Sequence, residues 1–303
     1  MHVLMTGGTG FVGRRLAERL AAAGHTLSVV SRDPEAAARV LPSATAIRSR
    51  VLDFRDAGVE AIVNLAGEPI ADKRWSAAQK RRLVDSRVTI TRELVTLCRS
   101  ADTPPRVMVS GSAMGYYGAQ GERVVDEDTP PHDEFAHRLC AEWEAAAREA
   151  ESTGVRVALL RTGLVLDAGG GTLAKMLPPF RLGLGGRFGD GRQFMPWIHR
   201  EDHVRSIEFL LARDDLDGPF NASAPHPVTN AEFTRTLAQR LHRPALLPVP
   251  GRLLELALGE MARLLLTGAD MRPRRLLDAG FRFDYETLDA ALAAILSRGK
   301  RRD

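Results

Sequence analysis

The sequence predicts an α/β protein with a doubly wound parallel sheet, followed by a smaller, α-rich C-terminal domain. Three observations carry this prediction. Short apolar runs alternate with helical stretches through the first half of the chain, and a glycine-rich turn joins the first run to the first helix. Hydrophobic residues make up 44% of the 303 residues, so the chain can form a sizeable core and is not wholly disordered.

The first half alternates between predicted strands and helices. Residues 2–6 are a short apolar run that ends at glycine, and Val12, Leu16 and Leu20 then recur at helical spacing until Gly24 ends the helix. Further strands are expected at 27–31, 47–52, 61–65, 106–110 and 155–161, and long helices at 76–100 and 134–150. Because such strands are joined through helices, they should pair in parallel with both sheet faces covered.

Beyond residue 161 the chain is richer in glycine and proline, notably at 169–171, 178–179 and 183–191. Helices are predicted at 202–213, 230–241, 253–265 and 285–296. We therefore expect one domain over residues 1–165, with its sheet completed by segments up to about 225. A second domain, 166–303, should pack over the carboxyl edge of the sheet, where ligands bind in such folds.

Charge and cysteine content narrow the function classes. The net charge is +4, and the basic run at 298–302 is best explained as a solvated terminus, so no nucleic-acid partner is expected. Cys98 and Cys140 lie in apolar helical stretches and are predicted to be buried free thiols in a reducing compartment. No apolar run approaches the roughly 20 residues of a membrane span, and no signal peptide precedes the first strand. These features predict a cytoplasmic protein without a membrane partner.

The strongest motif is the turn TGGTGFVG at residues 6–13. Gly7 permits a tight turn, Gly10 lets the backbone approach a pyrophosphate, and Gly13 lets the helix pack against the strand. Free N–H groups at the positive end of the helix then meet the anion. A dinucleotide is therefore expected against Gly7, Thr9, Gly10, Phe11, Val12 and Gly13.

The end of the second strand decides which dinucleotide binds. An NAD site places a carboxylate there for the ribose 2′-hydroxyl, whereas this chain has Ser31 and Arg32. The Arg32 guanidinium suits a 2′-phosphate, and Ser31 adds a hydroxyl donor. Asp33 lies one position later and is expected to cap the next helix. The predicted cofactor is therefore NADP(H).

Together, the turn at 6–13, the NLAG at 64–67 and the SGS at 110–112 resemble the extended short-chain dehydrogenase/reductase superfamily, which is Rossmann-like and includes nucleotide-sugar epimerases. Several segments resemble one atypical branch, the NAD(P)-binding epimerase-family proteins: NLAGE at 64–68, RW at 74–75, LGLGG at 182–186, FMPWIH at 194–199 and NAEF at 230–233. That branch ends in a small domain of unknown function, matched here at about 248–296. The resemblance implies further cofactor contacts from Asn64, Leu65, Ala66, Gly67 and Leu164. Arg87 replaces a common asparagine, and either binds a phosphate or pairs with a surface acid.

The superfamily's Tyr-x-x-x-Lys pair is absent. In this device the lysine charge lowers the pKa of a tyrosine acid/base, but no tyrosine here has a lysine four residues on. The matching helix positions hold His137 and Ala141. Ser112 matches the superfamily's active-site serine, and Tyr116, Tyr117 and His137 are the other catalytic candidates. Pocket packing by the tyrosines and a surface position for His137 remain the alternatives.

Two other chemistries are disfavoured. The HREDH at 199–203 has its glutamate one position too late for a zinc-protease helix, and no other His/Cys group has metal-ligand spacing, so no metal is expected. His199 and Asp202 instead match the superfamily's segment at the edge of the substrate site. The surroundings of Ser112 lack the two glycines of a hydrolase nucleophile elbow.

These observations favour an NADP(H)-dependent oxidoreductase or epimerase-like enzyme acting on a small polar molecule. The alternative is an NADP(H)-binding regulator or redox sensor with little turnover, which the missing Tyr-x-x-x-Lys supports. Arginines that favour an anionic substrate, unless they are merely solvated, are Arg87, Arg181, Arg187 and Arg192. Pairing of the two long helices between copies is compatible with a homodimer.

Overall fold

The computed structural model describes residues 1–299, and the basic run at 298–302 lies outside the side chains that it describes. Its centre is a seven-stranded parallel sheet with the strand order β11-β7-β5-β4-β1-β2-β3. The strands are β1 (His2–Thr6), β2 (Thr26–Val30), β3 (Ala46–Arg48), β4 (Ala61–Asn64), β5 (Val107–Ala113), β7 (Arg156–Thr162) and β11 (Gly218–Ala222). The predicted parallel α/β sheet is confirmed.

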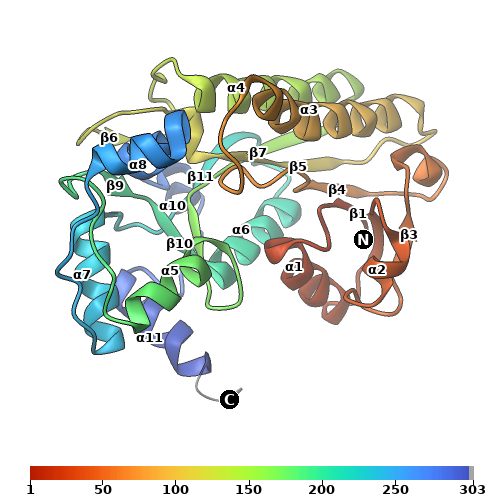
Figure 1. Ribbon diagram of the computed structural model, residues 1–303. Helices are drawn as coiled ribbons and strands as arrows, with labels where there is room; N and C mark the ends of the chain where they lie inside the picture. Colours follow the sequence, from red (N-terminus) through yellow and green to blue (C-terminus); the bar gives the residue numbers. More distant parts are fainter. Residues whose placement is uncertain (300–303) are drawn as a thin grey trace.

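Helices cover both faces of this sheet (Figure 1). On one face, α1 (Phe11–Ala22) and α6 (Arg200–Ala212) pack in one apolar cluster with Val3 and Met5 of β1. On the other, α3 (Ala77–Ser100) packs with Leu4, while α4 (Phe135–Arg148) lies beside α3. Because neighbouring residues of β1 point to opposite faces and both are buried, the strand reads as a continuous apolar run. Shorter pieces are α2 (Pro34–Ala38), η1 (Val51–Phe54) and η3 (Glu149–Thr153).

The C-terminal part packs beyond the carboxyl ends of β5, β7 and β11. Its strands are β8 (Leu164–Leu166), β9 (Phe194–Met195), β10 (Trp197–His199), β12 (Val228–Thr229) and β13 (Asp270–Met271), the last of which pairs with β6 (Val124–Val125). Its helices are α5 (Gly171–Arg181), α7 (Asn230–Leu241), α8 (Gly251–Leu258), η4 (Gly259–Ala262), α9 (Arg263–Leu266), α10 (Arg274–Asp278) and α11 (Leu288–Gly299). Trp197, Phe233 and Leu292 share the main apolar cluster of this part.

Several predicted elements differ from the structure. The helix predicted at 253–265 is broken at Gly259, whose φ of +61° is left-handed and ends α8. The helix predicted at 285–296 begins only at Leu288. Helix α5 was missed because Pro178 and Pro179 lie inside it. Its buried residues nevertheless recur at helical spacing: Leu173, Met176, Leu177 and Phe180.

Both cysteines are buried free thiols, as predicted. Burial raises the pKa of Cys98 to about 11 and that of Cys140 to about 12, so neither is a reactive thiolate at neutral pH. None of the helices in residues 1–299 combines the length and the hydropathy of a membrane span.

Candidate functional site

The glycine turn between β1 and α1 has no room for side chains. Gly7 has a φ of +67°, and a Cβ there would lie 2.7 Å from the Leu65 carbonyl group. A Cβ on Gly13 would lie 2.1 Å from the Gly7 carbonyl oxygen. The Gly10 N–H donates to that same oxygen at 3.0 Å and closes the turn. A close backbone approach therefore requires glycine at positions 7 and 13, whereas a Cβ on Gly10 would make one tight contact, 3.1 Å from the Gly7 carbonyl oxygen.

The first turn of α1 presents free donors. Gly10 is its N-cap and supplies no side-chain acceptor, and no acidic residue lies in the first turn. The N–H groups of Phe11, Val12 and Gly13 precede the first intrahelical bond, which Arg14 donates to Gly10. Thr9 is exposed beside them. This arrangement fits the pyrophosphate of a dinucleotide.

Of the side chains that follow β2, Asp33 caps helix α2 and Arg32 is exposed to solvent. Asp33 accepts from the Ala36 N–H at 3.0 Å and caps α2, as predicted. Ser31 bonds the Asp33 backbone at both its N–H and its carbonyl. Arg32 is exposed and carries no hydrogen bond or ion pair to the described residues. Its guanidinium is therefore available to a ligand at this edge of the sheet.

The loop after β4 lies opposite Arg32. A hydrogen bond from Gln79 lowers the pKa of the Glu68 carboxyl in this loop, and the nearby charge of Arg32 adds to the effect. Asn64, which ends β4, is fully buried: it accepts from Thr6 at 2.7 Å and donates to Thr91 and Ser110. Its amide thereby ties β1, β4, β5 and α3 together. Leu65 and Ala66 in this loop are half-buried, and Gly67 is exposed.

The Arg87 side chain on α3 holds that loop by hydrogen bonds. Its guanidinium donates to the carbonyls of Leu83 and Glu68 and lies 5.3 Å from the ring centre of Trp143. Burial lowers its pKa. A Cβ on Gly67 would lie 2.9 Å from the guanidinium carbon. Arg87 therefore fixes the loop through carbonyls rather than by pairing with a surface acid, and its buried Nε has no partner among the described residues.

A buried ion pair lies beneath the carboxyl end of β5. Arg161, the penultimate residue of β7, makes two parallel bonds to Glu144 on α4, at 2.9 and 3.0 Å. Both side chains are at least 94% buried. Ser112 donates its hydroxyl proton to Glu144 Oε1 at 2.7 Å. Ser112 can therefore accept a hydrogen bond from a ligand, but its proton is already engaged.

Tyr117 belongs to the same buried network. Its side chain is fully buried, its hydroxyl donates to Asn221 at 2.7 Å, and it accepts from Arg161 at 3.1 Å. Burial raises the pKa of this phenol. Glu127, also buried with a raised pKa, accepts from the Asn221 N–H at 2.9 Å. The network links β5, β7 and β11 to the segment around β6.

Tyr116 and His137 lie closer to the surface. The Tyr116 ring, at the end of η2 (Met114–Tyr116), has the Arg161 guanidinium carbon 3.4 Å from its centre. His137 on α4 makes an edge contact with the same ring at 5.2 Å. Its Nδ1 lies 2.7 Å from the Tyr116 carbonyl oxygen. Because a carbonyl only accepts, Nδ1 carries a proton, so the neutral form of this imidazole would have its lone pair on Nε2.

Other predicted residues border this centre. Leu164 is half-buried in β8, which pairs with β10. His199 caps α6 by accepting from Glu201, and its ring stacks on Tyr285 at 3.9 Å. Asp202 is buried and accepts from the backbone N–H groups of residues 284 and 285. These residues join α6 to the segment before α11. Within residues 1–299, no group of His, Cys, Asp and Glu side chains is arranged to hold a metal ion.

Sequence reasoning missed the Glu144–Arg161 pair. The signal was present, because Glu144 falls on the apolar face of α4 and Arg161 directly follows the apolar run at 157–160 in β7. Because an unpaired buried charge has a large desolvation penalty, two opposite charges at predicted buried positions are expected to form an ion pair.

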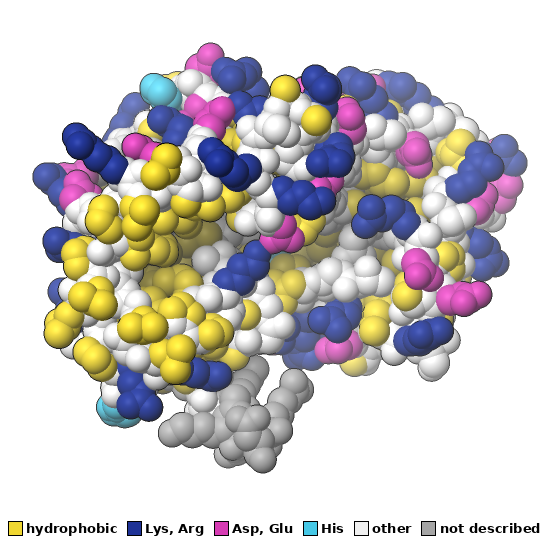
Figure 2. Space-filling model, in the orientation of Figure 1, with side chains coloured by type: hydrophobic (Ala, Val, Ile, Leu, Met, Phe, Trp, Pro, Cys, Tyr) yellow, Lys and Arg dark blue, Asp and Glu magenta, His cyan; other side chains and the backbone are white. Residues whose placement is uncertain are grey.

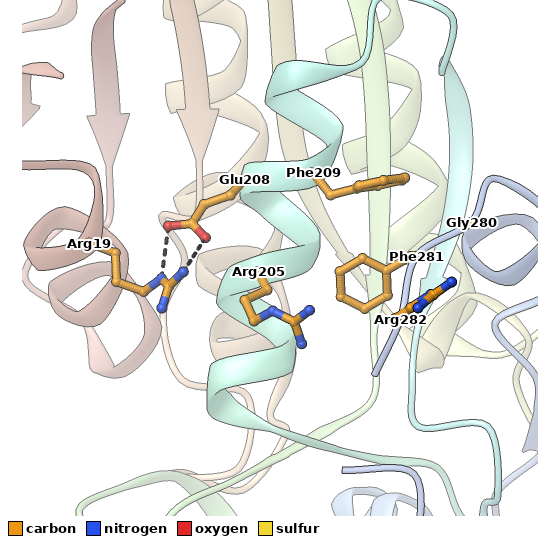
Figure 3. A pocket seen from close by; sticks show the side chains of 7 residues that line it. All are labelled: Arg19, Arg205, Glu208, Phe209, Gly280, Phe281 and Arg282. Carbon is orange, nitrogen blue, oxygen red and sulfur yellow. Dashed lines mark hydrogen bonds and ion pairs between the residues drawn. The ribbon is translucent and has the colours of Figure 1, made fainter. Parts of the chain in front are cut away.

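An open cavity of about 410 Å³ lies away from this centre, between α1, α6 and the segment after α10 (Figure 3). Arg19 in its wall is paired with Glu208, as the dashed lines show, and Arg205 is paired with Asp202 and Asp284. Arg19 and Arg205 are therefore engaged in contacts within the protein.

Comparison with known families covers nearly the whole chain. Residues 3–223 match the NAD dependent epimerase/dehydratase family, and residues 249–295 match a domain of unknown function, DUF1731. The human epimerase family protein SDR39U1 is 38% identical over 310 residues, spanning 98% of this chain and all of the human protein. The Bacillus subtilis epimerase family protein YfhF is 33% identical and spans 99% of both chains.

Solved structures agree with this assignment. A crystal structure of human SDR39U1, isoform 2, with NADPH superposes with a TM-score of 0.89 at 36% identity, covering 98% of this chain and 99% of that one. The extended short-chain dehydrogenase/reductase fold expected from the resemblance is thereby confirmed. This chain belongs to the NAD-dependent epimerase/dehydratase family, as an NAD(P)-binding member with a C-terminal DUF1731 domain.

Proposed function

We propose that this protein is an NADP(H)-dependent oxidoreductase in which His137 is the acid/base. The observation that carries the proposal is the bond between His137 Nδ1 and the Tyr116 carbonyl, which fixes the tautomer and leaves Nε2 as the reactive nitrogen. His137 stands where the superfamily has its tyrosine, so the role is retained while the residue type changes.

His137 transfers one proton in alcohol oxidation and one in the reverse reaction, carbonyl reduction. In alcohol oxidation, neutral Nε2 takes the substrate hydroxyl proton while the C–H bond breaks and its electron pair leaves the carbon. In reduction, the imidazolium returns that proton to the forming alkoxide. When bound, the nicotinamide accepts or supplies the hydride. The reacting hydroxyl gives its one proton to His137, so Ser112, whose own proton is held by Glu144, accepts a hydrogen bond from a second donor group of the substrate.

Position 141, where the superfamily has its lysine, holds an alanine here. Arg161 takes over the orienting role, because it fixes the position of His137 through Tyr116. Its guanidinium lies against the Tyr116 ring, and Tyr116 in turn holds His137 by ring edge and carbonyl. Arg161 is itself fixed by Glu144. A chain of contacts thus orients the imidazole from the buried ion pair, so Arg161 and Glu144 are positioning residues.

The choice of NADP(H) over NAD(H) rests on Arg32. It is exposed and unpaired among the described residues, at the end of β2 where a 2′-phosphate would lie. The NADPH in the human relative's crystal structure supports the same choice. The Ser31 hydroxyl, predicted as a second donor, instead donates to the Asp33 carbonyl, so the choice rests on the guanidinium. The anionic substrate, the homodimer and the cytoplasmic compartment stay predictions.

A regulator or sensor is the second candidate, and the engaged proton of Ser112 favours it. A serine that cannot donate to a carbonyl oxygen gives less electrophilic assistance than the superfamily's serine does. Such a protein would bind NADP(H) tightly and turn over slowly.

One experiment separates the two functions. Purified protein is mixed with NADPH and a panel of carbonyl compounds and nucleotide sugars, and the nicotinamide absorbance is followed. The enzyme is supported by NADPH oxidation that His137→Ala abolishes and that the Ser112→Ala variant weakens. Tight NADPH binding without oxidation across the panel supports the sensor.

A further inference from the structure

The segment formed by α8, η4 and α9 leaves two of its leucines exposed and five only partly covered. Residues 253–266 contain seven leucines, and none of them is buried. Leu253 is 55% and Leu256 77% exposed. No residue of α8 is buried at all, although most of its side chains are apolar. We call these seven residues the leucine surface: Leu253, Leu254, Leu256, Leu258, Leu264, Leu265 and Leu266.

More exposed leucines border it from two neighbouring loops. Residues 182–186 and 244–248 lie side by side, because a Cβ on Gly186 would lie 1.7 Å from the Leu247 carbonyl oxygen. Leu182 and Leu246 on these loops are 75% and 82% exposed. Figure 2 shows hydrophobic side chains gathered over α8 and α5 around a hollow in this face of the molecule. Contiguous exposed apolar patches of this kind mark binding surfaces.

The leucine surface is anchored to the helix end that carries His137. Arg263 on α9 pairs at 2.5 Å with Glu134, the N-cap of α4, three residues before His137. Lys80 on α3 pairs with Glu260 in η4, also at 2.5 Å. The segment therefore borders the approach to the proposed acid/base.

A second set of contacts joins the same segment, and the residues that follow it, to Gln193, Gln120 and Tyr117. Gln193 donates to the Leu265 carbonyl at 2.7 Å, and the Gln120 N–H donates to Gly268. Ala269 and Met271 then pack against the buried Tyr117 ring. Residues 267–271, which follow the leucine surface directly, therefore contact the buried Tyr117 ring of the candidate site.

We propose that the leucine surface binds an apolar chain of the substrate, so that the substrate is an alcohol or carbonyl compound carrying an alkyl or aryl group. The proposal rests on the proposed function, because it places the reacting carbon at His137 and the chain along α8 and α9. Apolar walls with a few convergent polar groups are the usual composition of a small-molecule site, and the hollow in Figure 2 gives this surface the concave shape that such a ligand needs.

The test varies chain length while the reacting group stays the same. The full-length protein with NADPH is given straight-chain aldehydes from short to long, and kcat/KM is measured for each. Every methylene that lies on the leucines should raise kcat/KM about three- to fourfold. The double variant Leu254→Asn/Leu258→Asn should flatten this dependence. Leu277→Asn, at an exposed leucine on α10, should leave it unchanged.

A binding measurement keeps the proposal separate from the enzyme hypothesis. Straight-chain alcohols are titrated into the NADP⁺-loaded protein by calorimetry. Affinity that rises with chain length and is lost in the double variant supports the apolar subsite, even if no aldehyde is reduced and the proposed function fails. Affinity and kcat/KM that are both independent of chain length overturn it. A third result also overturns the proposal: the double variant keeps the chain-length dependence of the wild type but no longer dimerises, or no longer binds phosphatidylcholine vesicles. The leucines would then contact a second copy of the protein or a membrane instead of the substrate.

Discussion

His137 donates its Nδ1 proton to the Tyr116 carbonyl oxygen across 2.7 Å. This single bond distinguishes the helix position from an ordinary solvated histidine, because it selects one tautomer and points Nε2 away from the backbone. Tyr116 is in turn stacked on Arg161, so the imidazole is connected to a buried ion pair.

Arg32→Ala should weaken NADPH binding by about 2 kcal/mol, roughly 30-fold, and change NADH binding little. The reason is that only NADPH carries the 2′-phosphate that the exposed guanidinium would meet. Fluorescence titration with both cofactors measures the difference. Arg39→Ala, an exposed arginine at the end of α2, is the matched control. Wild-type protein that prefers NADH would show that the assignment of Ser31 and Arg32 is wrong.

Gly13→Ala should destabilise the fold by about 1–3 kcal/mol and remove dinucleotide binding. The added Cβ would meet the Gly7 carbonyl oxygen at 2.1 Å, and neither backbone segment can move without opening the turn. Thermal unfolding with and without NADPH reports both effects. Arg14→Ala, the next and exposed position of α1, should keep the stabilisation by NADPH. A Gly13→Ala protein that binds NADPH normally would contradict the tight approach.

Glu144→Gln should cost about 3–5 kcal/mol of stability, because it leaves the Arg161 charge buried without its counter-ion. Glu142→Gln, at an exposed position of the same helix, should cost almost nothing. Urea unfolding of both variants gives the comparison. Equal stability of the two variants would mean that the buried pair contributes no more than a surface carboxylate.

Acidification should destabilise the protein through His203. Burial lowers the pKa of this histidine from 6.5 to about 4, and its Nε2 is 2.9 Å from the Thr162 hydroxyl. Between those two pH values the unfolded chain binds more protons than the folded one, so unfolding becomes easier as the pH falls. The free energy of unfolding is unaffected by His203 above about pH 6.5, and it falls by about 3 kcal/mol on acidification to about pH 4. Unfolding free energies measured over this range for wild type and His203→Gln should diverge in slope, whereas parallel curves would exclude His203 as the cause.

Much of the fold could be read from the sequence because its signals are local. The apolar run of β1, the glycines at 7, 10 and 13 and the helical spacing of α1 each depend on residues close together in the chain. The cap at Asp33 was predictable for the same reason. Element boundaries and the interrupted helix at Gly259 were not, since apolar periodicity continues across the break.

The candidate site was less predictable because its contacts join distant segments. Ser112 and His137 were identified from their positions, but the engagement of Ser112 by Glu144 depends on the packing of α4 against β5. The link from Arg161 to Tyr116 spans 45 positions in the sequence. Arg87 was expected to bind a phosphate or to pair with a surface acid; its guanidinium donates to two backbone carbonyls rather than to an acid, and the phosphate contact stays a prediction. Only the tertiary structure shows which polar groups already have partners.

The pH-dependent turnover of His137→Gln tests the central claim most directly. With any carbonyl substrate that wild type reduces, kcat should fall on the order of 10²–10⁴-fold and lose its dependence on a single titrating base, while the Kd of NADPH stays unchanged. His132→Gln, an exposed histidine before the same helix, should behave as wild type. A His137→Gln protein with wild-type kcat and an unchanged pH profile would contradict the assignment of His137 as the acid/base.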